Sequence, residues 1–125
     1  MEWITKKYAK VTSGGSDVTI SICKQDIGQS RVSVTFRNNV YAKITKNEYV
    51  AIAVSGARLY FREYSPAEGF KLTSYNKART SCVFRIPESA LDLSKTRIST
   101  GDYRLQYDPS MKMYYIDGNN RIKYE

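Results

Sequence analysis

Two pairs of arginines recur at one spacing and carry the clearest chemistry in this sequence. Arg31 and Arg79 are separated by the same interval as Arg37 and Arg85. The first pair lies at the start of an alternating segment, and the second lies at its end. A guanidinium offers bidentate donors that match phosphate and the guanine edge. The pairs therefore predict a nucleic-acid-binding surface, and solvated strand ends are the alternative.

Another basic group surrounds an aromatic residue. Arg58, Tyr60 and Arg62 alternate along one short segment. If that segment is a strand, the three side chains share a face. Such a stripe can hold a phosphate backbone and stack on bases. Alternatively, Tyr60 belongs to the core and the arginine stems cover it.

The overall charge favours a polyanionic partner. The 125 residues include 20 Lys and Arg against 12 Asp and Glu, a net charge of +8. Nucleic acid, DNA first, is the partner that such a balance predicts, and an acidic protein is the alternative. The 11 tyrosines suit either kind of surface, because their side chains combine an apolar body with a polar tip.

Enzymatic and metal chemistry are not expected. The chain has no histidine, which removes the commonest general base and metal ligand. Cys23 and Cys82 are too few for a structural zinc site and are predicted to be buried free thiols. We therefore expect no catalytic residues, no metal and no cofactor. Without an apolar run of about 20 residues or a signal peptide, we expect a cytoplasmic protein with no membrane contact.

Alternation of apolar and polar residues predicts an all-β fold in a single domain, residues 1–125. Short helices or helical turns are expected near 39–45, capped by Asn38, and near 87–92, with Pro87 in the first position. Strands are predicted over 3–12, 18–22, 32–36, 49–54, 58–62, 70–73, 80–85, 103–107, 113–116 and 121–124.

The two halves of the chain resemble each other. Residues 31–72 and 79–117 both run through strand, short helix, strand, turn and strand, and several residue types match between them. Residues 1–30 would then be an added N-terminal hairpin region. Duplicated units bury a shared core only when they pack together. Chance similarity between two β-rich stretches is the alternative.

Two motifs resemble the half-barrel unit of AbrB/MazE-type swapped-hairpin proteins. One is the strand and Ile-Pro helix start of 83–91, and the other is the Gly-Asp strand opening of 101–105. The likeness covers 79–108 and, more faintly, 31–63. It implies that two units interlock into one barrel, here a single-chain pseudo-two-fold barrel, and that basic residues face DNA.

Three function classes follow from these observations. A nucleic-acid-binding regulator is the leading hypothesis, through Arg37 and Arg85 aided by Arg31, Arg79, Arg58, Arg62 and Tyr60. A protein-binding accessory factor, such as an inhibitor from a phage or mobile element, is the second. An enzyme is the third, because lysine, tyrosine or carboxylate chemistry needs no histidine. An oligomer is compatible with the first two.

Overall fold

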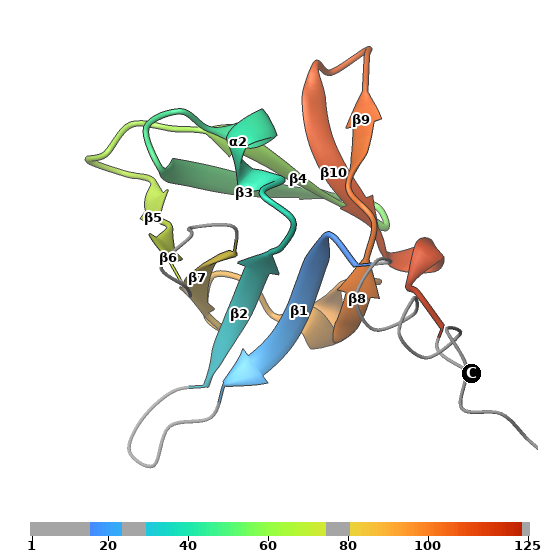
Figure 1. Ribbon diagram of the computed structural model, residues 1–125. Coiled ribbons are helices and arrows are strands. Elements are labelled where there is room, and N and C mark those ends of the chain that lie inside the picture. The colour runs from blue at the N-terminus through green and yellow to red at the C-terminus, as the bar shows by residue number, and fades with distance from the viewer. Residues whose placement is uncertain (1–15, 24–29, 75–80, 124–125) are drawn as a thin grey trace, which may run out of the picture.

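The chain folds into two antiparallel sheets of five strands each, which confirms the all-β class (Figure 1). The computed structural model describes residues 16–23, 30–74 and 81–123. Sheet A has the order β6-β7-β2-β1-β8, and sheet B has the order β5-β3-β4-β10-β9. Their strands are β1 Val18–Cys23, β2 Arg31–Phe36, β3 Tyr49–Ser55, β4 Arg58–Glu63, β5 Phe70–Lys71, β6 Thr73–Ser74, β7 Cys82–Pro87, β8 Gly101–Tyr103, β9 Gln106–Asp108 and β10 Met113–Asp117.

Sheet A is built around the predicted hairpin. β1 and β2 pair antiparallel with Val18 opposite Phe36, and β2 pairs on its other side with β7. The alternation of apolar and polar residues sends Val32, Val34 and Phe36 toward sheet B. Their neighbours on β2 consequently point to the outside of sheet A.

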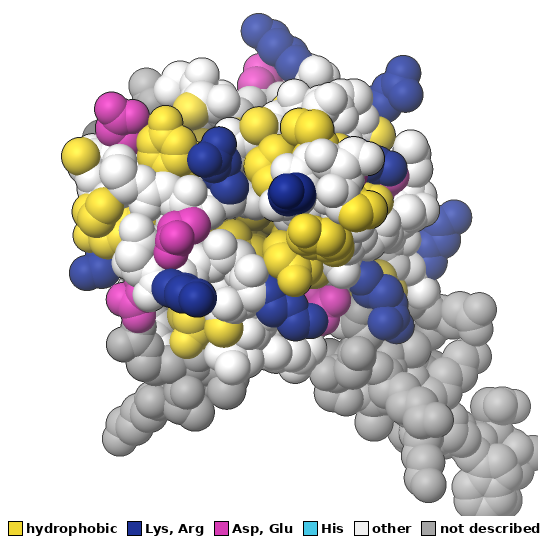
Figure 2. All heavy atoms as spheres, turned by 90° about the horizontal axis from the view of Figure 1, so that it is seen from above, with side chains coloured by type: hydrophobic (Ala, Val, Ile, Leu, Met, Phe, Trp, Pro, Cys, Tyr) yellow, Lys and Arg dark blue, Asp and Glu magenta, His cyan; other side chains and the backbone are white. Residues whose placement is uncertain are grey.

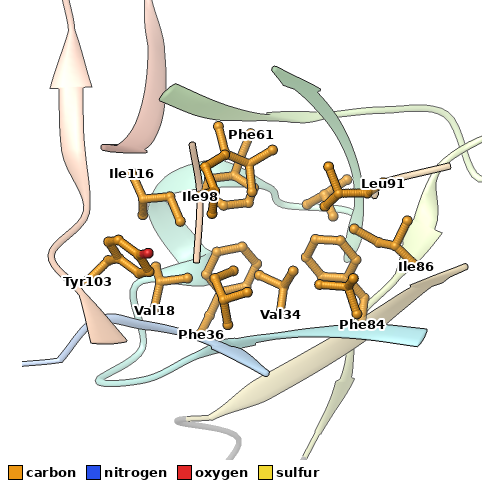
Figure 3. Packing of buried hydrophobic residues seen from close by; sticks show 14 of the residues in the cluster. Val18, Val34, Phe36, Phe61, Phe84, Ile86, Leu91, Ile98, Tyr103 and Ile116 are labelled. Atoms are coloured by element: carbon orange, nitrogen blue, oxygen red, sulfur yellow. The ribbon is translucent and has the colours of Figure 1, made fainter. Parts of the chain in front are cut away.

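The core lies between the two sheets (Figure 3). Phe36 from sheet A meets Phe61 from sheet B with 5.1 Å between ring centroids, and Phe84 packs against Phe36 within sheet A. Tyr103 is fully buried, and its hydroxyl donates to the Ser99 carbonyl at 2.6 Å. This single apolar cluster holds the outer faces of the two sheets in fixed positions.

Two segments pass from one sheet to the other, one at each edge. The predicted strand over 70–73 is divided into β5 in sheet B and β6 in sheet A. The predicted strand over 103–107 is divided in the same way, because β8 belongs to sheet A and β9 to sheet B. Strands that change sheet form the corners of such double-sheet folds.

The helical segments are shorter than predicted. Within 39–45 the structure has one α-helix, α2 Tyr41–Ile44. Asn38 does not cap it, because the Asn38 amide donates to the Ser16 carbonyl and both Asn38 and Asn39 have positive φ. Within 87–92 there is only a turn, in which the Pro87 carbonyl accepts from the Ala90 and Leu91 amides. Two 3₁₀ helices follow, η1 Leu93–Lys95 and η2 Gly118–Asn120.

The two segments predicted to be like units differ in strand pairing. After β2 and α2, the first segment pairs β3 with β4 inside sheet B. After β7 and η1, the second segment places β8 and β9 in different sheets. The strand order therefore differs between the halves, and a duplication stays a prediction. The described residues form two five-stranded antiparallel sheets, and the single-chain pseudo-two-fold barrel stays a prediction.

Candidate nucleic-acid interface

Three of the predicted arginines lie on the outer side of sheet A. Arg85 is exposed between the buried Phe84 and Ile86 of β7, so its side chain points away from the core. Arg31 is exposed at the start of β2, and Arg37 follows the end of the same strand. Arg37 and Arg85 are thus not equivalent, because β2 ends one residue before Arg37 while β7 continues past Arg85 to Pro87.

Arg31 and Arg85 form a pair at one end of this face. Arg31 stands opposite Pro87, which is two residues beyond Arg85 on the neighbouring strand. Diagonal neighbours of this kind have Cβ atoms about 7–8 Å apart. The two guanidiniums can therefore reach the same or adjacent phosphates.

A second pair lies at the other end, about 20 Å away along β2. The Arg37 amide donates to the Asp17 carbonyl at 2.7 Å, and the Asp17 carboxylate accepts from the Leu105 amide at 3.0 Å. Arg37 and Arg104 consequently flank Asp17 at one end of the sheet, about two strand spacings or 10 Å apart. Both are exposed. Sequence reasoning missed Arg104, although it lies within the Gly-Asp strand opening of 101–105.

The part of the outer face formed by β2 and β7 is closed to solvent at its centre. Ser33 and Thr35 on β2 are only 5% and 4% exposed, and Val83 on β7 is 2% exposed. The charged side chains that this face offers to a partner are the arginines at its two ends.

Polar side chains hold Arg37 in place. Its Nε donates to the Thr19 hydroxyl at 3.1 Å, and that hydroxyl donates to the Asp102 carboxylate at 2.6 Å. Ser16 also donates to Asp102, at 3.2 Å. An open hollow of about 510 Å³ lies beside this carboxylate, lined by Gly101, Asp102, Arg121, Ile122 and Lys123. Arg121 and Lys123 thus lie on the β8 side of this network, across β1 from Arg37.

The predicted stripe on β4 does share one face, but two of its members, Arg58 and Tyr60, are engaged with each other. The Tyr60 hydroxyl donates to the Asp108 carboxylate at 2.9 Å, and Arg58 pairs with the same oxygen at 3.2 Å. The Arg58 guanidinium lies 4.2 Å from the centre of the Tyr115 ring. Tyr60 is 7% exposed, so it belongs to the structure of sheet B and cannot stack on a base.

Arg62 is the exposed member of that stripe. Its guanidinium lies 5.8 Å from the centre of the Tyr64 ring. It borders two shallow hollows, one of about 450 Å³ with Asn47 and Glu68 and one of about 400 Å³ with Lys112. It lies on sheet B, away from the arginine pairs of sheet A.

The carboxylates are used mainly to fix turns rather than to neutralise cations. Glu63 accepts from the backbone N–H groups of Lys46 and Asn47, which lower its pKa. Asp92 accepts from the Ser94 hydroxyl and amide, which also lower its pKa. Between described residues, Arg58–Asp108 is the one ion pair. The arginines on sheet A therefore project positive charge without a carboxylate partner among these residues.

The remaining predictions concern Arg79, the two cysteines, membrane spans and metal sites. Arg79 lies outside the described residues. Cys82 is buried, and β2 separates its strand from that of Cys23. In the part of the chain that the structure describes, no helix is long and apolar enough to span a membrane, and no His, Cys, Asp or Glu cluster could hold a metal ion.

Known proteins offer no guide to this surface. No protein-family model, curated protein or solved structure matches the chain. The resemblance to AbrB/MazE-type proteins therefore stays a prediction, and a function has to be argued from the geometry.

Proposed function

We propose that this protein binds nucleic acid, DNA in the first place, as a regulatory protein that uses the arginines of sheet A. The observation that supports this most directly is the pair of basic ends, Arg31 with Arg85 and Arg37 with Arg104. They are exposed, lie about 20 Å apart, and have no carboxylate partner among the described residues. Arginine forks in such positions suit separate phosphates on one backbone.

The other predicted residues have smaller parts in this proposal. Arg62 can add a phosphate contact from sheet B, whereas Arg58 and Tyr60 are held by Asp108 and contribute to the fold. Because phosphate contacts carry no sequence information, binding through these arginines tolerates many sequences.

The test replaces one arginine from each end. In a fluorescence anisotropy titration with a short DNA duplex at low salt, Arg37→Ala/Arg85→Ala should weaken binding by on the order of tenfold or more. The double variant Lys43→Ala/Lys95→Ala removes the same charge from exposed sites elsewhere and should bind nearly as the wild type does. Both variants should keep the thermal stability of the wild type, since exposed substitutions usually cost under about 0.5 kcal/mol.

Two results would argue against the proposal. Equal weakening by both double variants would mean that only net charge matters. Absence of DNA and RNA binding by the wild type would leave the basic ends as a docking surface for an acidic protein, the accessory-factor alternative.

A further inference from the structure

The β9–β10 hairpin extends beyond the rest of the molecule (Figure 1). Its side chains include two of the most exposed large apolar residues in the described chain, Tyr107 at 50% and Met111 at 53%. Seen from above, hydrophobic side chains gather among lysines and arginines (Figure 2). An exposed aromatic residue on a projecting arm can reach a partner that a flat sheet cannot.

The ring of Tyr107 has aromatic support within the hairpin. Tyr107 stands opposite Tyr114 in the hairpin, with 4.9 Å between ring centroids and 58° between ring planes. Tyr114 in turn stands opposite Phe61 on β4, whose ring packs against Phe36. Because the half-buried Tyr114 ring lies against it, Tyr107 presents a supported surface with few conformations to lose on binding.

The turn of the hairpin is also fixed. One oxygen of the Asp108 carboxylate accepts from the Ser110 and Met111 amides, at 2.9 and 3.2 Å. The other oxygen binds Tyr60 and Arg58 on β4. Asp108 therefore ties the turn of the hairpin to β4, in addition to the pairing of β10 with β4.

The charges around Tyr107 complement a polyanion. Arg104 precedes the hairpin and Lys112 lies in its turn, and both are exposed. Asp108 is the one carboxylate between these two cations, and it is occupied by four donors. Arg104 also belongs to the arginine pair with Arg37, so the hairpin continues the basic end of sheet A.

We infer that Tyr107 is a stacking platform for an unpaired base, so that the nucleic acid bound here is single-stranded where it meets the hairpin. This inference rests on the proposed function and adds the class of ligand to it. Arg37 and Arg104 hold the phosphates, and the tyrosine ring receives a neighbouring base. Aromatic stacking with flanking cations is the arrangement that single strands require, because every base has a π face.

The experiment compares a single-stranded oligonucleotide carrying 2-aminopurine with a duplex of the same sequence. Tyr107→Ala should weaken single-strand binding by about tenfold and abolish the fluorescence change of 2-aminopurine, with duplex affinity unchanged. Tyr107→Phe keeps the ring and should retain both signals. Tyr64→Ala removes another exposed tyrosine, 37% exposed, and should change neither the single-strand affinity nor the 2-aminopurine fluorescence.

The two proposals fail differently in this experiment. If the wild type binds neither nucleic acid, the proposed function fails and this inference fails with it. If the wild type binds both but Tyr107→Ala changes neither affinity, only the stacking platform is overturned. It is also overturned if Tyr107→Ala disrupts self-association and leaves single-strand binding intact, because the tyrosine would then contact protein.

Discussion

Some polar side chains in this protein stabilise the fold, and others remain available to contact a binding partner. Asp108 belongs to the first group, since it holds Arg58, Tyr60 and the hairpin turn together. Sequence reasoning placed Arg58 and Tyr60 on one face correctly but could not assign their roles. Both side chains contact a carboxylate almost 50 residues further along the chain, and no local sequence pattern indicates such a contact.

Stability at acidic pH should depend on Asp108. The hydrogen bond from Tyr60, followed by those from the Met111 and Ser110 amides, lowers the pKa of Asp108 below its ordinary value of about 4. A carboxyl whose pKa is lower in the folded state contributes stability that is complete above the unfolded-state pKa. That contribution is lost as the pH falls through the folded-state pKa. Urea denaturation at a series of pH values should therefore show that the free energy of unfolding falls more steeply toward acidic pH in the wild type than in Asp108→Asn. The same pH dependence in both proteins would contradict this role.

Most strands could be predicted from the sequence because their alternation is local. The hairpin of β1 and β2 and the strands β3, β4, β7 and β10 were expected within a few residues. The two segments that pass from one sheet to the other were not predicted, because the alternation of apolar and polar residues continues through both bends. They depend on distant hydrogen bonds, from the Leu72 amide to the Glu48 carbonyl at 2.8 Å and from the Leu105 amide to the Asp17 carboxylate.

Gly118 joins elements that are distant in sequence, and an added methyl group should separate them. Its amide donates to the Ala57 carbonyl at 2.7 Å, in the turn between β3 and β4. A Cβ atom at this position would collide with the backbone carbonyl of Arg97. Gly118→Ala should therefore lower the free energy of unfolding by about 2–3 kcal/mol in chemical denaturation.

Gly56 provides the matched control for that substitution. It has a φ of +62° and open space where a Cβ would lie. Asparagine tolerates this backbone conformation, so Gly56→Asn should cost under about 1 kcal/mol. Equal costs for the two variants would show that the crowding at Gly118 is relieved by movement of the backbone.

At the scale of the whole molecule, the sequence indicated a basic surface but not its layout. Net charge and arginine positions are visible in the sequence, whereas the assignment of strands to two sheets is not. That assignment places Arg31, Arg37 and Arg85 on one side and Arg62 on the other. It also adds Arg104, which becomes a neighbour of Arg37 only through Asp17.

The dependence of binding on salt concentration shows whether the arginines of sheet A contact phosphates. Each phosphate contact releases counterions, so four arginine contacts should give a slope of about −3 to −4 in a plot of log affinity against log salt concentration. Removing Arg37 and Arg85 together should reduce that slope by about half, whereas removing Lys43 and Lys95 should leave it unchanged. A slope near zero for the wild-type protein would contradict the assignment of these arginines to nucleic-acid binding.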